Sequence, residues 1–360
     1  MKRILVGATF AVLALASCAT PQSQPSDSPS STSASQSPTQ CWKSPLTGLC
    51  ADETSPVVVA KIDDVSGARP QYGLMNADLT IIEPVEGGLT RLMAVFASDV
   101  PTEVGPIRSA RITDIDLVPM FGKPGFAYSG SASKLVPYLE DASLQLIGHP
   151  QGGTGYIRID THAAPHNLVG VYSELIGRIG NLAAAQLSPT LGWNFAETPT
   201  LGRKVVHSVI KWPSAERRFV WDETLQQWGI KVYKEKLMTA ESTSAALEQV
   251  FTTTVYIMET ELLDSEFGDS NGNATPYAQT FGEGTGWVLS HGEVIQARWE
   301  RKNLTDLPQW FTLSGSPIAV LPGKAWLAIV DDRTEIDFKY VTSSTSPSPS
   351  SSATPSATKS

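Results

Sequence analysis

The pattern of apolar residues is clearest between residues 79 and 97, where two strand-like runs flank a Glu-Gly-Gly turn at residues 86–88. Glycine adopts the positive φ angles of tight turns without strain, so the pattern predicts a β-hairpin with strands at residues 79–85 and 89–97. An apolar run at residues 56–63, PVVVAKID, predicts a buried strand ahead of the hairpin. We expect the rest of the chain to be organised around this hairpin.

Helical spacing appears in several later stretches. Residues 173–186 place their apolar side chains on one face, which predicts an amphipathic helix. Shorter helices are predicted at residues 109–120, with Ser109 as the N-cap, and from Ser131 or Ser133 to Ala142. Beyond a stretch rich in Pro, Gly and Thr at residues 188–199, short apolar runs separated by turns indicate antiparallel strands. These strands are predicted at residues 204–211, 217–221, 227–232, 253–259, 286–289, 294–299, 318–321 and 326–330, with one helical patch at 243–250.

Together these elements predict an α+β protein with two folded domains. An N-terminal mixed α/β domain is expected at residues 41–190, followed by a smaller, mostly antiparallel β domain at residues 200–341. The length of 360 residues agrees with this division, because it exceeds what one compact core usually needs.

The two ends of the chain differ in composition from the middle. Lys2 and Arg3 precede an apolar run at residues 4–16, which is the order of an export signal, and the run is shorter than the ~20 residues that span a bilayer. Residues 15–18, Leu-Ala-Ser-Cys, resemble a bacterial lipobox, which implies a signal peptide at residues 1–17 and a diacylglyceryl anchor, with palmitate among its acyl chains, on Cys18. An ordinary secretory leader is the alternative. Residues 18–40 and 342–360 are rich in Ser, Thr and Pro and are expected to form a linker and a disordered tail that could carry O-glycans.

Of the three cysteines in the chain, Cys41 and Cys50 remain once Cys18 is assigned to the lipid. An even number of cysteines in an oxidising compartment indicates a disulfide, which here would hold the start of the folded region. Two thiols without a nearby histidine are an incomplete ligand set, so we expect no metal at this pair.

Charged residues gather around the hairpin. Arg91 should lie opposite Glu83 or Glu86 across the two strands, either as an ion pair or as part of a site. Glu83 and Glu86 should point to opposite faces unless the turn rotates Glu86, which makes them a poor acid/base pair for cleaving a glycosidic bond. Arg108 and Arg111 would share a face of a helix and, with Ser109, would suit a phosphate or a carboxylate. The alternative is that the arginines pair with nearby carboxylates.

A histidine pair follows at residues 162 and 166. Two imidazoles four residues apart share a face only on a helix, and Pro165 opposes a helix, so no metal site is expected here either. His166, followed by Asn167, could form a hydrogen bond or act as an acid/base group at the edge of a loop. A structural role for His166 is the alternative.

The chain resembles the YerB-like bacterial lipoproteins, a family of two-domain proteins of uncharacterised function. The residues that carry the resemblance are PLTG (45–48), ARPQ (68–71) with Gly73 and Leu74, AD (77–78), Glu83 with EGG (86–88), TR (90–91), GPIRSAR (105–111), PHNL (165–168), and PGK (322–324) with Trp326. The resemblance covers nearly all of the folded part. The resemblance implies descent from this family and a place in the cell envelope, but it does not imply any particular reaction.

These observations lead to a prediction of place and of function. The protein is expected on the outer face of the cytoplasmic membrane, held there by its lipid, as a cell-envelope protein. Its predicted role is to bind an anionic or glycan envelope ligand in a polar groove, with Arg91, Arg108, Ser109, Arg111 and Asn167 as binding residues. The alternative is a hydrolase or transferase acting on wall polymers, with Glu83, Glu86 or His166 as the catalytic group. No cofactor is expected, and a formal net charge of −9 without a basic run argues against nucleic acid as a partner.

Overall fold

The structure is a computed structural model that describes residues 41–51, 55–188, 190–269 and 272–342. Its folded part is one compact unit that begins at Cys41. The predicted signal peptide, the lipidation site at Cys18, the linker at residues 18–40 and the tail from residue 343 lie outside the described residues. Within the described ranges, none of the helices has the length and apolar character needed to cross a membrane.

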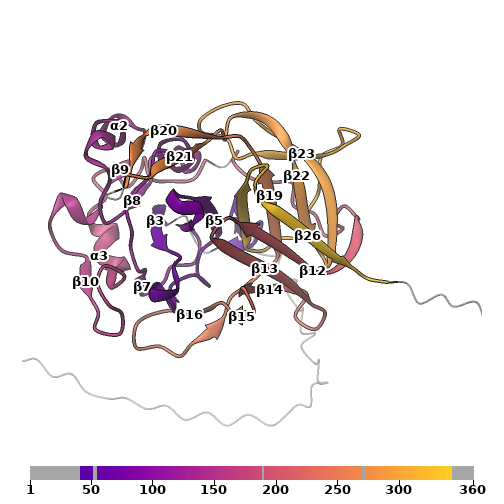
Figure 1. Cartoon of the computed structure of the whole chain (residues 1–360), viewed down its shortest axis with the longest axis horizontal. Helices are drawn as coiled ribbons and strands as arrows, with labels where there is room; N and C mark the ends of the chain where they lie inside the picture. The colour runs from indigo at the N-terminus through magenta and orange to yellow at the C-terminus, as the bar shows by residue number, and fades with distance from the viewer. Residues whose placement is uncertain (1–40, 52–54, 189, 270–271, 343–360) are drawn as a thin grey trace, which may run out of the picture. The chain divides into compact units, whose positions relative to one another are not determined.

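One large sheet joins most of the strands (Figure 1). From one edge to the other it contains β15 (Glu235–Lys236), β14 (Gln227–Val232), β13 (Ala215–Asp222), β12 (Arg203–Trp212), β23 (Glu293–Arg301), β22 (Gly282–Ser290), β19 (Thr254–Glu259), β25 (Ala325–Val330), β5 (Leu79–Pro84), β6 (Thr90–Phe96), β3 (Val58–Asp63), β8 (Gly125–Ala127) and β9 (Gln145–Leu146). Three more strands pair with it: β18 (Phe251–Thr252) with β14, β24 (Gln309–Thr312) with β23, and β26 (Glu335–Tyr340) with β12. Because β25 pairs in parallel with both β19 and β5, the sheet passes from the second half of the chain into the first without a break.

Small sheets and short helices surround the large sheet. The small sheets are β1 (Trp42–Lys43) with β2 (Cys50–Ala51); β10 (Tyr156–Arg158), β11 (Leu168–Val171) and β7 (Glu103–Val104); β17 (Glu248–Gln249), β16 (Met238–Ala240) and β4 (Gln71–Tyr72); and β20 (Leu262–Gly268) with β21 (Ala274–Ala278). The α-helices are α1 (Asp114–Leu117), α2 (Val136–Asp141) and α3 (Tyr172–Gly177). The 3-10 turns are η1 (Ser66–Ala68), η2 (Glu86–Gly88), η3 (Val118–Phe121), η4 (Ser133–Leu135) and η5 (His149–Gln151). Cys41 and Cys50 are bonded across β1 and β2, with their Cα atoms 5.5 Å apart.

The central strands are buried on both faces. Alternate side chains of β3, β5 and β6 enter two separate cores: Val59, Ile81 and Met93 belong to one, and Ala60, Ile82 and Leu92 to the other. Burial on both faces explains why these strands are nearly continuous apolar runs in the sequence.

The predicted hairpin is confirmed, because β5 and β6 pair antiparallel around η2 with Glu83 directly opposite Arg91. The fold as a whole is mostly β, with 44% of residues in strands and 11% in helices, so the α/β character expected of the first domain is present only in part.

The helix predictions are the main errors. The segment at residues 109–120 becomes helical only at Asp114, so Ser109 caps no helix. Residues 107–110 are instead extended, because the Arg108 amide donates to the Lys61 carbonyl and the Ala110 amide to the Gly130 carbonyl, both at 2.8 Å. The helix predicted at residues 173–186 ends at Gly177, and residues 243–250 contain the short strand β17 rather than a helix. The helix predicted to end at Ala142 is present as η4 and α2, but its N-cap is Ala132 and not a serine.

Candidate functional site

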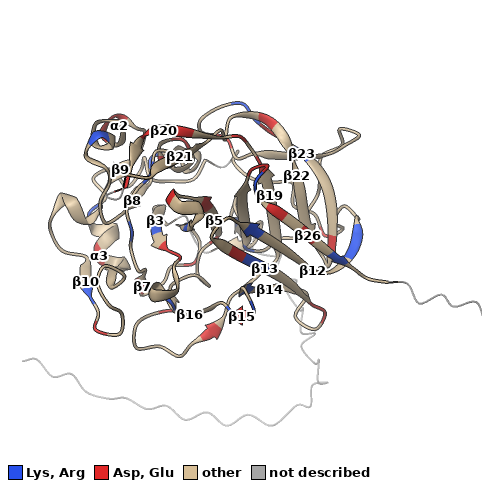
Figure 2. Ribbon diagram, viewed as in Figure 1, with Lys and Arg blue, Asp and Glu red and all other residues tan. Residues whose placement is uncertain are grey.

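One face of the central strands changes from apolar to charged toward one end. On β3, Lys61 and Asp63 continue the face that Val59 begins. The strand register then places Asp63, Arg91 and Glu83 in one row across β3, β6 and β5. Lys61, Asp63 and Glu83 are fully buried and Arg91 is 8% exposed. Figure 2 shows positive and negative segments side by side at β3, in the centre of the view.

Lys61 joins two buried carboxylates. Its Nζ forms an ion pair with Glu83 Oε2 and lies 2.6 Å from Asp114 Oδ1, and all three side chains are 0% exposed. Burial lowers the pKa of Lys61 to about 8, and Asp114 opposes that shift, so the ammonium is retained at neutral pH. The second oxygen of Asp114 accepts the Arg111 amide at 2.6 Å. Lys61 therefore fixes the start of α1 against β3 and β5.

Asp63 is the centre of a second group of charges. Its Oδ2 lies 2.8 Å from Arg108 Nε and 2.7 Å from His166 Nδ1, and its Oδ1 lies 3.9 Å from Arg91 Nε. The Arg108 contact is an ion pair whose angles do not meet hydrogen-bond geometry. Within the described part of the chain, the two terminal nitrogens of Arg108 donate no hydrogen bond to the protein, and its side chain is 21% exposed.

Glu86 holds the next arginine. Its Oε2 accepts from Arg111 Nε and Nη2 at 2.9 and 2.8 Å, and its Oε1 accepts from the Thr275 hydroxyl. Burial acts to raise the pKa of Glu86, but the charge and hydrogen bonds of Arg111, with the bond from Thr275, outweigh it and hold that pKa below its usual value. Burial, assisted by the charge of Arg111, lowers the pKa of Arg91 to about 10. Arg91 is therefore charged at neutral pH.

These groups form the floor of a cleft of about 700 Å³. The volume is in the usual range for small-molecule sites. Its cations and hydroxyls are Arg91, Arg108, Arg111, Lys134, Ser109, Ser131 and Ser133. Apolar side chains and the β20–β21 hairpin complete the lining, namely Val85, Leu89, Ile112, Leu135 and Phe267, with Glu266, Asp269 and Thr275. Asp63, which holds Arg91 and Arg108, is fully buried, whereas Glu86, which holds Arg111, itself lines the cleft.

Most of the residues predicted from the sequence are brought together here. Glu86, Arg91, Arg108, Ser109 and Arg111 all line the cleft. Arg108 and Arg111 both line the cleft, although the segment that contains them is not helical as predicted. The turn η2 rotates Glu86, as the sequence analysis allowed, since Gly87 within it has a φ of 69°.

The other predicted residues lie beneath the cleft or apart from it. Glu83 is fully buried against Lys61, His166 contacts Asp63, and neither residue lines the cleft. Asn167 belongs to a different contact, because its Oδ1 accepts from Arg158 Nη1 at 2.7 Å. Within the ranges that the structure describes, no group of three or more His, Cys, Asp or Glu residues could hold a metal ion.

Sequence reasoning missed Lys61 and Asp63, which organise the site. A signal was present: two opposite charges at spacing two inside the apolar run PVVVAKID place both on one buried face, where each needs a partner. It also missed Thr275 and Lys134, whose positions depend on contacts far away in the sequence.

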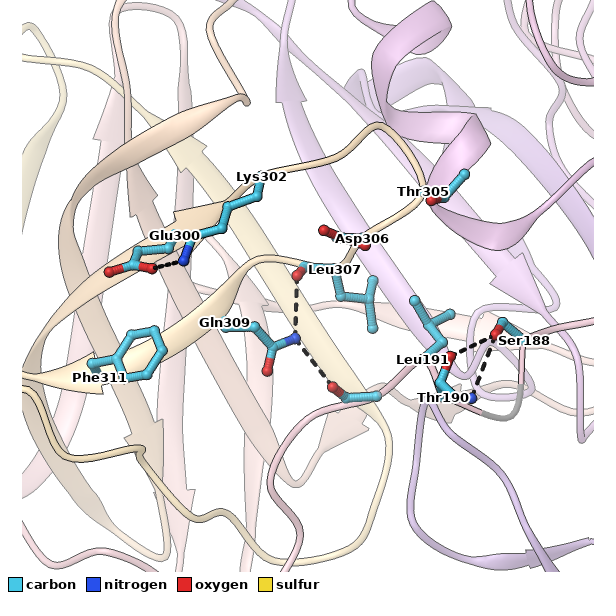
Figure 3. Close-up of a pocket in the computed structure, with 11 residues that line it drawn as sticks. Ser188, Thr190, Leu191, Glu300, Lys302, Thr305, Asp306, Leu307, Gln309 and Phe311 are labelled. Atoms are coloured by element: carbon cyan, nitrogen blue, oxygen red, sulfur yellow. Dashed lines mark hydrogen bonds and ion pairs between the residues drawn. The ribbon is translucent and has the colours of Figure 1, made fainter.

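Another pocket, of about 340 Å³, offers a ligand fewer unoccupied polar groups (Figure 3). Its polar side chains mainly bond to neighbouring groups: Lys302 lies 3.1 Å from Glu300, and the Gln309 amide donates to the carbonyls of Leu307 and Gly192 at 3.2 Å. We therefore take the arginine-lined cleft as the candidate site.

Comparison with known proteins places the chain in a family. Residues 46–185 match the N-terminal domain, and residues 208–327 the C-terminal domain, of DUF3048, described as proteins of unknown function. The "Putative lipoprotein YerB" of Bacillus subtilis (strain 168) is 25% identical over 307 residues, which cover 81% of this chain and 86% of that protein. The crystal structure of YerB from Bacillus subtilis matches with a TM-score of 0.68 and 24% identity, covering 82% of this chain and 99% of that one.

Proposed function

Because the chain belongs to the YerB-like DUF3048 family, whose function is not assigned, we propose from the site itself that the protein binds an anionic ligand of the cell envelope in the arginine-lined cleft. The observation that carries the proposal is Arg108. Its Nε is held by the buried Asp63 at 2.8 Å, its side chain is 21% exposed, and the residue lines the cleft. A planar fork with two free ends is the arrangement that binds phosphate or carboxylate oxygens in pairs.

The surroundings of Arg108 support an anion rather than a neutral ligand. Arg91, Arg111 and Lys134 line the same cleft, and the carboxylates that fix Arg91 and Arg108 are buried beneath them. The donors are already fixed, so little side-chain freedom is lost when a ligand binds. The serine hydroxyls and the apolar wall suit the sugar or glycerol part of a polymer that carries the anionic groups.

The N-terminal residues bear on where the protein is located in the cell. We infer that Cys18 carries a lipid and that the folded unit is held at the outer face of the cytoplasmic membrane. The relative named as a lipoprotein supports this inference. Cys18→Ala should leave an uncleaved precursor that takes up no tritiated palmitate, because the acyl-bearing sulfur is gone. Globomycin should instead leave an uncleaved precursor that is still labelled, because it blocks cleavage and not diacylglyceryl transfer. A normally processed, unlabelled wild-type chain would overturn the lipid anchor.

Binding can be tested with the full chain in a neutral detergent and a purified phosphate-bearing wall polymer. Arg108→Gln should weaken binding about tenfold or more, since one hydrogen bond to a charged group contributes about 1.5–3 kcal/mol. Arg298→Gln is the control, because Arg298 is a 38% exposed surface arginine outside the cleft. Equal affinity of wild type and Arg108→Gln would refute the proposal. Affinity should also fall as salt is added.

One observation favours a second function. His166 Nδ1 lies 2.7 Å from the buried Asp63, which is how a carboxylate orients a histidine that acts as a general base. Glu86 suits this role less well, because its lowered pKa makes it a weak base and both its oxygens already accept hydrogen bonds. If the protein is a hydrolase or transferase, wild type should release fragments from the polymer and His166→Gln should not. Intact polymer after prolonged incubation with wild type would exclude that reading.

A further inference from the structure

A second cationic pocket lies across the sheet from the cleft. Asp63 and Asp64 are neighbours at the end of β3, and successive side chains of an extended chain point to opposite faces. Asp63 holds the arginines of the cleft, whereas Asp64 lies in a pocket of about 170 Å³. We call it the Arg217 pocket; its main lining residues are Asp64, Arg69, Leu89, Thr90, Arg217 and Tyr233.

Two guanidinium groups share one carboxylate in the Arg217 pocket. Arg217 Nη2 forms an ion pair with Asp64 Oδ2, and Arg69 Nη2 lies 3.7 Å from Asp64 Oδ1 and donates to the Asp64 carbonyl at 2.5 Å. Glu216 also lines the pocket, but Arg218 neutralises it at 2.7 Å. The pocket therefore keeps an excess positive charge.

Unused hydrogen-bond donors point to a missing partner. The Nε atoms of Arg69 and Arg217 are both buried and have no hydrogen-bond partner in the described structure, and neither has Asp64 Oδ1. The Arg217 side chain is 2% exposed, so solvent does not compensate for the missing acceptor. Unpaired buried polar groups cost free energy, and an oxyanion in the pocket would place negative charge beside both guanidinium groups. The volume suits a single phosphate, sulfate or carboxylate group.

Leu89 connects this pocket to the cleft. It lines both of them and is 38% exposed at the end of the hairpin turn. A chain with anionic groups on either side of a short apolar link could therefore cross Leu89 and reach both sets of arginines. Two linked contacts bind more tightly than either alone, because the second becomes intramolecular.

We propose that the Arg217 pocket is a second oxyanion subsite, and that the ligand is a polyanion whose successive anionic groups occupy the cleft and this pocket. The inference rests on the proposed function, since the first group is held by Arg108. It narrows the ligand class to a polymer with repeated phosphate or similar groups, rather than a single small anion.

The test uses inorganic phosphate probes of increasing length with the full chain in neutral detergent: orthophosphate, tripolyphosphate and long-chain polyphosphate. Wild type should bind the long chain at least tenfold more tightly, per chain, than tripolyphosphate. Arg69→Gln should remove most of this gain while leaving tripolyphosphate affinity within about twofold, because the cleft is unchanged. Ser66→Asp, at an exposed position of the same pocket, should act in the same way by repulsion and should leave the fold intact, since substitutions at exposed surface positions rarely alter stability.

The outcomes separate this inference from the proposed function. If wild type binds no phosphate probe, or if Arg108→Gln has no effect, both fail. If wild type binds tripolyphosphate through Arg108 but gains nothing from length, or if Arg69→Gln and Ser66→Asp leave the gain intact, only the second subsite fails. Arg298→Gln should behave as wild type with every probe, and circular dichroism should show native spectra for each variant.

Discussion

Replacing Lys61 by methionine tests whether the floor of the cleft depends on one buried ammonium. Methionine keeps most of the aliphatic side chain and removes the charge that joins Glu83 to Asp114. Removing one partner of a buried ion pair costs about 3–5 kcal/mol, because it leaves an uncompensated charge away from water. Here one ammonium serves two carboxylates that are both 0% exposed, so we expect a loss near the upper end, about 5 kcal/mol.

That loss is large beside the about 5–15 kcal/mol by which folded domains are usually stable. Urea unfolding at pH 7, followed by the fluorescence of the nine tryptophans, measures it directly. The matched control is Lys211→Met, whose pair with Glu335 at 2.9 Å is exposed on both sides and should leave the unfolding midpoint unchanged. If Lys61→Met and Lys211→Met unfold at the same urea concentration, the buried lysine does not hold the site together and the reasoning is refuted.

Three further predictions follow from the same region and from the N-terminal bridge. Glu86 has a pKa below its ordinary 4.5 in the fold, so its stabilising charge is fully present above about pH 4.5 and is lost as pH falls through the folded pKa. The difference in unfolding free energy between wild type and Glu86→Gln should therefore shrink below that pH, and a constant difference would contradict the assignment. Gly88→Ala should destabilise more than Gly87→Ala: both have a φ of +69°, but the added Cβ at Gly88 would lie 2.6 Å from Pro213 Cβ, whereas at Gly87 it meets nothing within 4 Å. Thermal melts compare the two, and equal melting temperatures would contradict the contact. Replacing Cys41 and Cys50 together by serine should cost about 2–3 kcal/mol in unfolding free energy, and a non-reduced peptide digest showing two free thiols in wild type would contradict the bond.

The sequence allowed the hairpin and much of the cleft to be predicted, because both depend on local patterns. The Glu-Gly-Gly turn sets the register that places Glu83 opposite Arg91. These two charged residues interrupt the apolar runs near the turn, and so they mark where the two strands end. Lys61 and Asp63 were overlooked because they lie inside a run that packing alone explains. Their partners, Asp114 and Arg108, come from segments whose approach the sequence does not reveal.

The helix errors have a common physical cause. Residues 107–110 are extended because the Arg108 and Ala110 amides donate to the Lys61 and Gly130 carbonyls and the Arg108 carbonyl accepts from the Ser129 amide. Such long-range bonds outweigh a local helical preference. The helix α3 ends at Gly177, and glycine is about 1 kcal/mol less favourable than alanine within a helix. Beyond this point Ile179 is buried as the apolar spacing predicted, but Leu182 is 48% exposed, because the chain has left the helix.

The cleft belongs to both halves of the chain. Its arginines come from the first half, but Thr275 from the second half bonds Glu86, and the β20–β21 hairpin forms the facing wall. Arg217, also from the second half, bonds Asp64 beneath the turn, and β25 supplies the neighbour that β5 needs. An isolated first half would therefore lose the fixed position of Glu86 and Arg111 and expose an edge of the central sheet. On the proposed function, ligand binding would depend on both halves of this chain, so substitutions in the second half should alter affinity even where they touch no arginine of the cleft.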